Sequence, residues 1–263
     1  MAAATAHSRW TVEILAEAPS TNAAVAFRAR SGADEGLVVV AEHQSSGRGR
    51  LDRTWVAPAR SALTVSVLLT PSEVPVGRWP WLPLLAGVAT AHAVRRSCGV
   101  DAALKWPNDV LVGGAKLAGI LVERVVDGSA ASAPAAVLGI GVNVSTLPGE
   151  LPVRTATSLG LVSGAAVDRT ALLLHLLDAI AEHYDPWRAA GGDPAGGLRA
   201  AYLSICDTVG REVRVELPSG GLVEGRAVGI DTDGRLRLET GSGAMVLGAG
   251  DVVHVRTHEP QSC

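Results

Sequence analysis

Apolar and polar positions alternate along the first two hundred residues in two different periods. Runs rich in β-branched residues predict strands over 10–18, 37–41, 61–70, 102–106, 110–112, 117–126 and 135–144. S-T-N at 20–22 predicts the cap of a helix over 23–30, and helices are expected over 79–98, 168–184 and 198–206. Tight turns at P-N-D and G-G-A-K favour antiparallel pairing, so we expect an α+β fold with a mixed or antiparallel sheet.

The pattern changes after Cys206. Four segments then alternate with period two around turns such as D-T-D-G: V-R-V-E-L, L-V-E-G-R-A-V-G-I, D-G-R-L-R-L-E and V-V-H-V. Roughly fifty residues of short strands are the size of a small SH3-like β-barrel. We therefore expect one domain over 1–206 and a C-terminal barrel domain over 207–263.

Composition narrows the class of protein. With 48% hydrophobic and 19% charged residues the chain is globular, and its formal net charge of −3 disfavours a dedicated nucleic-acid binder. Three widely spaced cysteines and no H-E-x-x-H sequence favour neither a disulfide framework nor a zinc site, which suits a reducing cytoplasm. We expect no secretory leader and no membrane span.

Lysine and asparagine are scarce in this chain. Only two of the 23 basic residues are lysines, and there are only three asparagines. A coding bias towards arginine explains the scarcity, but under such a bias the remaining lysines should mark positions where arginine does not serve. Lys105, Asn108 and Lys116 fall within twelve residues, so we expect this window to be functional.

A loop over 43–55, H-Q-S-S-G-R-G-R-L-D-R-T-W, combines three arginines with two glycines. Guanidinium groups suit carboxylate and phosphate oxygens, and glycines permit close backbone approach. The loop matches neither the nucleoside-triphosphate phosphate loop nor the dinucleotide-binding motif. Taken alone, it is equally consistent with a solvated arginine loop.

The sequences K-W-P-N-D-V and G-G-A-K place Lys105 and Lys116 on either side of a turn that presents Asn108 and Asp109. A lysine on an apolar strand is costly to bury without an anion, and an incoming phosphate or carboxylate would provide one. Asp109 is suited to holding Mg²⁺ or to positioning an amine. The alternative is ordinary turn chemistry beside a charge at a strand edge.

G-I-G-V-N-V over 139–144 does not fit a dinucleotide loop, because Pro148 and not a helix follows it. Glycines within a strand suggest close approach by a ligand or another backbone, and taken alone a packing role explains them at least as well. Asn143 is suited to pairing with a base or another polar ligand edge.

Taken in order, these segments resemble the biotin–protein ligases. The motifs that carry the resemblance are S-T-N, the loop over 43–55, K-W-P-N-D-V, K-L-A-G-I-L and G-I-G-V-N-V, and the terminal barrel also fits. The resemblance implies a class II synthetase-like catalytic domain that converts biotin and Mg-ATP to biotinyl-5′-adenylate. Biotin would then pass to a lysine of a biotin carboxyl carrier protein.

The resemblance also implies an organisation. Only nine residues precede Trp10, so we expect a ligase without a DNA-binding domain. It further implies a monomer or weak homodimer with Mg²⁺, ATP, biotin and the carrier protein as its cofactor, substrates and partner. Neither nucleic acid nor a membrane is expected as a partner.

Residue roles follow from the same resemblance. Those implied for biotin are Ser20, Thr21, Asn22, Gln44, Gly47, Arg48, Lys116, Gly119 and Gly139. Those implied for the nucleotide are Arg50, Arg53, Trp55, Lys105, Asn108 and Asn143. Lys116, Arg50 and Asp109 are the implied catalytic groups, and Asp109 is also the candidate ligand of the metal.

Two alternatives stay open. A lipoate–protein ligase shares the expected fold and chemistry, and the K-W-P-N-D and G-R-G-R sequences together with the barrel favour biotin. A non-enzymatic nucleic-acid-binding module would require clustered basic residues on the barrel, whereas this segment intersperses arginine with aspartate and glutamate.

Overall fold

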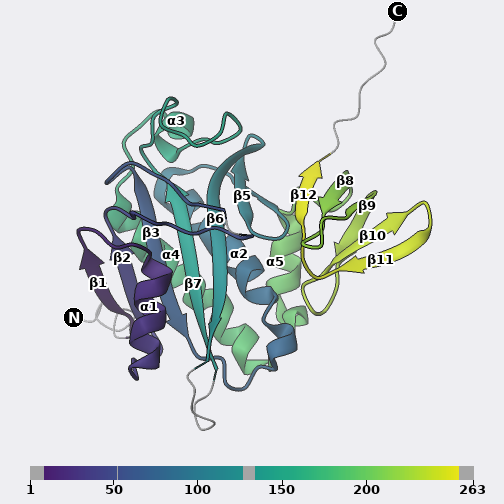
Figure 1. Cartoon of the computed structure of the whole chain (residues 1–263), viewed down its shortest axis with the longest axis horizontal. Coiled ribbons are helices and arrows are strands. Elements are labelled where there is room, and N and C mark those ends of the chain that lie inside the picture. The colour runs from purple at the N-terminus through teal and green to yellow at the C-terminus, as the bar shows by residue number, and fades with distance from the viewer. Residues whose placement is uncertain (1–8, 52, 127–133, 255–263) are drawn as a thin grey trace, which may run out of the picture.

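A seven-stranded sheet and a five-stranded sheet organise the molecule (Figure 1). The computed structural model describes residues 9–51, 53–126 and 134–254. The larger sheet has the order β1-β2-β3-β7-β6-β5-β4; β1 and β2 are parallel and every other pair is antiparallel. The mixed α+β prediction is therefore confirmed. Its strands are β1 (Thr11–Leu15), β2 (Leu37–Ala41), β3 (Ala62–Leu69), β4 (Ala103–Lys105), β5 (Asp109–Val112), β6 (Ala115–Val125) and β7 (Ala135–Asn143).

Helices cover both faces of this sheet, which explains the uninterrupted apolar run of β2. On one face Val39 packs in a cluster with Val25 of α1 (Thr21–Arg30). On the other face Val38 and Val40 join the main core, which includes α2 (Trp81–Cys98) and α4 (Arg169–Ala189). Every residue of β2 is consequently buried.

The helix boundaries follow the capping residues. Ser20 caps α1 by accepting a hydrogen bond from the amide of Ala23, and α2 ends at Gly99 in the left-handed conformation. Asp168 is the cap of α4, which continues to Ala189, five residues beyond the predicted end. The remaining elements are α5 (Leu198–Ser204), the unpredicted α3 (Leu159–Ser163) and short 3-10 turns at Val76–Arg78 and Pro194–Gly196.

The smaller sheet confirms the prediction that short antiparallel strands follow Cys206. Its order is β11-β10-β9-β8-β12, and within the described residues β11 and β12 are its edges. Its strands are β8 (Glu212–Glu216), β9 (Leu222–Ile230), β10 (Leu236–Thr240), β11 (Gly243–Leu247) and β12 (Asp251–His254). The interpreted domain boundary at 206/207 falls between α5 and β8. The ends of both interpreted domains, 1–8 and 255–263, lie outside the described residues.

Two tryptophans fasten the smaller sheet to the larger domain. The indole of Trp81 donates to the carbonyl of Thr232 at 2.9 Å, and that of Trp106 donates to the carbonyl of Gly234 at 3.1 Å. Buried side chains of both sheets belong to one continuous hydrophobic cluster. The turn over 231–234 is thereby fixed against the larger domain, with β8 and β12 beside the β4–β5 turn.

No helix within the described ranges is long and apolar enough to cross a membrane.

Candidate active site

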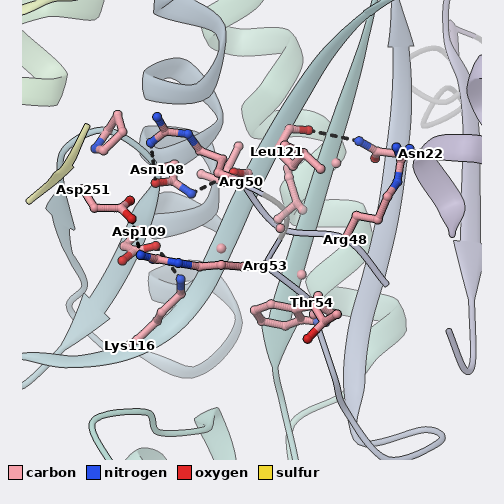
Figure 2. Close-up of a pocket in the computed structure, with 18 of the residues that line it drawn as sticks. Asn22, Arg48, Arg50, Arg53, Thr54, Asn108, Asp109, Lys116, Leu121 and Asp251 are labelled. Carbon is pink, nitrogen blue, oxygen red and sulfur yellow. Dashed lines mark hydrogen bonds and ion pairs between the residues drawn. The ribbon is translucent and has the colours of Figure 1, made fainter. Parts of the chain in front are cut away.

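A cavity of about 320 Å³ opens where the loop over 43–55, the β4–β5 turn and the smaller sheet meet strands β6 and β7. Figure 2 shows its two ends: Asn22 and Arg48 lie at one, and Asp109, Lys116 and Asp251 lie at the other. The expected site residues that line this cavity are Ser20, Thr21, Asn22, Gln44, Arg48, Arg50, Arg53, Trp55, Lys105, Asn108, Asp109, Lys116, Gly119 and Gly139.

The first turn of α1 forms a hydrogen-bonded end of the cavity that is neutral overall, because the charged groups there, Arg48 and Glu123, pair with each other. Both the amide and the hydroxyl of Thr21 donate to Gln44 Oε1, at 2.7 and 3.0 Å. Asn22 Oδ1 accepts from the Ser66 hydroxyl at 2.6 Å, and Asn22 Nδ2 donates to the Leu121 carbonyl at 3.2 Å. These bonds join α1, the loop, β3 and β6, so this end of the cavity is preorganised.

Glycines on β6 and β7 leave room for two of the chain's own side chains. A Cβ at Gly139 would lie 2.1 Å from Asn22 Oδ1, and a Cβ at Gly141 would lie 2.5 Å from the Trp55 ring. Gly119 is the cross-strand neighbour of Gly141 and also faces Trp55, at 3.4 Å. The side chains of Asn22 and Trp55 thus pack into the space beside these glycines, as the packing interpretation expects, and an approach by a ligand stays a prediction.

Asp109 joins the two lysines. Its Oδ1 lies 2.6 Å from Lys116 Nζ and its Oδ2 lies 3.2 Å from Lys105 Nζ. Asp109 opens β5 directly opposite Lys105, the last residue of β4, and Lys116 enters from β6. Lys105, Asp109 and Lys116 thus form a single charge cluster. Only 13% of the Asp109 side-chain surface is exposed.

These residues do not fit a resident magnesium ion. Both oxygens of Asp109 already accept from ammonium groups. In addition, the described part of the chain contains no group of three or more His, Cys, Asp or Glu side chains placed to hold a metal. Mg²⁺ usually takes one or two carboxylates together with the phosphates of a substrate. Asp109 is therefore a partner of the two lysines in this structure, and an ion that arrives with substrate phosphates would not need a resident site.

The loop arginines reach partners on three other parts of the chain. Arg48 pairs with Glu123 of β6 at 2.9 Å, whereas Arg53 pairs with Asp251 of β12. The loop is thus anchored at one side to the large sheet and at the other to the C-terminal sheet. Glu123 and Asp251 were absent from the sequence-based candidates, because nothing in their local sequence marks them.

Arg50 points into the charged end of the cavity, where its Nη1 donates to Asn108 Oδ1 at 3.1 Å. Burial lowers the pKa of the Arg50 guanidinium from its ordinary value, while the charges of Asp251 and Asp109 act in the opposite direction. Asn108 in turn donates to the Ile120 carbonyl at 3.0 Å. The turn residue therefore orients the guanidinium and does more than close the turn.

Two expected site residues lie outside the cavity lining. A Cβ at Gly47 would lie 2.4 Å from the Trp55 carbonyl oxygen, so this glycine permits the loop to fold against itself. Asn143 is buried, and its Nδ2 donates to the Thr157 carbonyl at 3.0 Å. The physical reason is that the segment over 155–157 pairs beside Lys116 and takes up this amide. The Asn143 amide nitrogen is therefore engaged within the chain, and its contact with a nucleotide stays a prediction.

Comparison with known protein families first identifies the class of protein. Residues 16–143 match the Biotin/lipoate A/B protein ligase family, and residues 208–255 match the Biotin protein ligase C terminal domain. The first match contains every cavity-lining residue of the larger domain, and the second contains Glu216, Asp251, Val252 and Val253. Both halves of the site thus lie within recognised ligase domains.

Relatives then narrow the family. The chain is 44% identical over 249 residues to the biotin–[acetyl-CoA-carboxylase] ligase of Mycobacterium tuberculosis, which covers 93% of this chain and 89% of that one. It is 33% identical to the Paracoccus denitrificans protein of the same name, with 91% and 98% covered. A biotin protein ligase from Aquifex aeolicus, solved in complex with biotin and ATP, superimposes with a TM-score of 0.76 at 27% identity, covering 94% of this chain and 99% of that one. The chain belongs to the biotin protein ligase family.

Proposed function

We propose that this chain activates biotin with Mg-ATP to biotinyl-5′-adenylate and transfers biotin to a lysine of the carrier domain of acetyl-CoA carboxylase. The observation that carries the proposal is the division of one cavity into a neutral polar end and a cationic end. Biotin has the same division, with a neutral fused ring at one end and a carboxylate at the other. The names and ligands of the relatives support the same substrates.

The neutral end suits the biotin ring. Thr21, Asn22 and Gln44 supply hydroxyl and amide groups whose positions are fixed by bonds within the chain. Gly119 and Gly139 let Asn22 and the indole of Trp55 approach the wall closely, and the indole closes the wall on one side. The two charged groups at this end, Arg48 and Glu123, pair with each other, so the uncharged ring would lie here with its carboxylate directed towards Lys116.

The cationic end suits the first reaction, in which the biotin carboxylate attacks the α-phosphate and pyrophosphate leaves. Two anions must approach each other, so cations that neutralise the shared charge lower the barrier. We assign this role to Lys116 and Arg50, and contact with the leaving phosphates to Arg53 and Lys105, because all four side chains line the cavity. The substrate's oxygens would take the place of Asn108 and Asp251 on Arg50 and Arg53. Each lysine ammonium has three N–H donors, so Lys105 and Lys116 would bind substrate with the others while one stays on Asp109.

The second reaction joins the acceptor lysine to the carboxyl carbon of the adenylate and releases AMP. It needs the mixed anhydride sheltered from water until the carrier arrives. The loop over 43–55, anchored through Arg48 and Arg53 to opposite walls, is positioned to provide that shelter.

A cytoplasmic setting and a monomeric or weakly dimeric state complete the proposal. Cys98 and Cys206 are free thiols, which suits a reducing compartment. The nucleic-acid alternative is disfavoured by the C-terminal sheet, where Arg214 pairs with Glu224 at 2.7 Å and Arg235 pairs with Asp231 at 2.8 Å. Arginines neutralised in this way do not form a phosphate-binding stripe.

The test uses purified protein, Mg-ATP, an isolated carrier domain and either biotin or lipoate. Intact-mass measurement should show one biotinyl group on the carrier lysine, dependent on ATP. A carrier domain with that lysine replaced by arginine is the control. Transfer of lipoate in place of biotin would refute the biotin assignment, and transfer of neither would refute the ligase assignment.

A further inference from the structure

The two lysines of the active site are also the only two lysines of the chain. Both line the cavity and both donate to the same carboxylate, Asp109. The other cations of the cavity are arginines, and none of these shares Asp109: Arg48 pairs with Glu123, and Arg53 with Asp251. The pairing with Asp109 is therefore specific to the amines.

This arrangement matters because of the intermediate that the proposed function creates. Biotinyl-5′-adenylate is an acylating agent whose intended target is a lysine amine. Arginine is not a competing target, because its guanidinium stays protonated. Lys105 and Lys116 do carry an amine that can be acylated, and they lie in the cavity that would hold the intermediate. Each turnover thus exposes the enzyme's own lysines to the reagent before the carrier arrives.

We propose that Asp109 protects the enzyme from self-biotinylation by holding Lys105 and Lys116 as hydrogen-bonded ammonium groups. The inference rests on the proposed function and assigns these two lysines as latent modification sites. An ammonium has no lone pair, so neither nitrogen can attack while it donates to the carboxylate. Lys105, whose bond to Asp109 is longer at 3.2 Å against 2.6 Å, is the first site to be modified when protection fails.

The suppressed reaction balances as an acyl transfer. A neutral Nζ forms a bond to the carboxyl carbon of biotin, the bond from that carbon to the phosphate oxygen breaks, and AMP leaves with the electron pair. The nitrogen releases one proton to solvent. The product is an uncharged amide, so modification at Lys116 would also remove a cation from the site.

Asp109 opposes this reaction and does not assist it as a base. Moving a proton from either ammonium to the carboxylate would abolish the attraction between them. That attraction is strengthened by the shielding of Asp109, which exposes only 13% of its side chain. The carboxylate also serves both lysines at once, so its removal should release two amines together.

The experiment compares the wild type with D109N, and uses D101N as the matched control. Asp101 pairs with Arg95 at 3.0 Å on the exposed surface and does not line the cavity. Each protein receives synthetic biotinyl-5′-adenylate without any carrier, which makes the result independent of adenylate synthesis. A lysine-rich bystander protein in the same tube reports reaction with free reagent.

Intact mass and peptide mapping then locate the biotin, with only two lysines to consider. D109N should be modified about tenfold more than the wild type at Lys105 or Lys116, the factor that about 1.4 kcal/mol of lost pairing produces. D101N and the bystander should be unchanged. In D109N/K105R, modification at position 105 should vanish, because a guanidinium is not acylated.

Equal or lower modification of D109N would overturn the proposal, and lower modification would identify Asp109 as a base. If D109N does not fold, the wild type decides the question. Its two lysines must react at least about tenfold more slowly than those of the bystander, and equal rates would overturn the inference. Pyrophosphate release from biotin and ATP, measured separately on the wild type, tests the ligase function itself.

Discussion

Replacing Gly139 with alanine tests whether the neutral end of the cavity is as rigid as its hydrogen bonds indicate. The added Cβ would lie 2.1 Å from Asn22 Oδ1 and 2.9 Å from its Nδ2. Asn22 cannot rotate away freely, because it accepts from Ser66 and donates to Leu121 and Glu123. The substitution must therefore break bonds that hold a buried amide.

The expected loss in the free energy of unfolding follows from those hydrogen bonds. Displacing Asn22 removes at least two hydrogen bonds of about 1 kcal/mol each and leaves buried polar groups unpaired at a further cost of about 1–3 kcal/mol. Alanine recovers about 0.5–1 kcal/mol relative to glycine in a strand. The net expectation is a loss of about 2–4 kcal/mol in the free energy of unfolding, or roughly 5–12 °C in Tm.

Thermal unfolding and biotin titration calorimetry provide the assay, with G229A as the matched control. Gly229 also lies within a strand, β9, and a Cβ there would meet nothing within 4 Å. G229A should keep or slightly raise Tm and should bind biotin normally. G139A should lose stability and at least about tenfold in biotin affinity. A G139A protein that matches G229A in both measurements would refute the claim that Asn22 is held rigidly.

Three further outcomes are expected. Lys116→Ala should lower pyrophosphate release at least about 100-fold while leaving Tm nearly unchanged, and near-normal release would show that another cation stabilises the transferred phosphate. Burial lowers the pKa values of His92 and His183, so the unfolded chain binds more protons than the folded chain below about pH 6.5. The free energy of unfolding should therefore fall as pH is lowered. His183→Gln should reduce this dependence of stability on pH, and an unchanged dependence would exclude the histidine pair as its origin. Trypsin cleavage between Arg48 and Arg53 should slow when biotin and ATP are added, and equal cleavage rates with and without them would argue against closure of the loop.

Sequence alone located much of the candidate site because its residues come from short, local stretches. The scarcity of lysine drew attention to Lys105 and Lys116, and both lie against the cavity as one cluster. Their common partner, Asp109, lies in the same window, so local turn geometry suffices to bring the three together. The apolar periodicity of the strands and the cap at Ser20 likewise determine elements over a few residues.

The remaining features depend on contacts between distant segments. The resemblance implied a nucleotide contact for Asn143, but it did not reveal that Asn143 Nδ2 donates to the carbonyl of the distant Thr157. Asp251 reaches Arg53 only because the C-terminal sheet docks at the mouth of the cavity. No local pattern encodes such a docking, because it follows from which surfaces are left to pack after each domain has formed.

The indole contacts of Trp81 and Trp106 with the turn over 231–234 affect how mutations of this chain should be interpreted. They join the two sheets within one hydrophobic cluster, so the domains are expected to melt together in a single cooperative transition. A substitution that destabilises the smaller sheet would then unfold both domains and abolish activity. In a mutational scan, inactive substitutions in β9 or β10 would therefore report on shared stability, and only those that preserve the melting temperature would identify side chains that act on substrate.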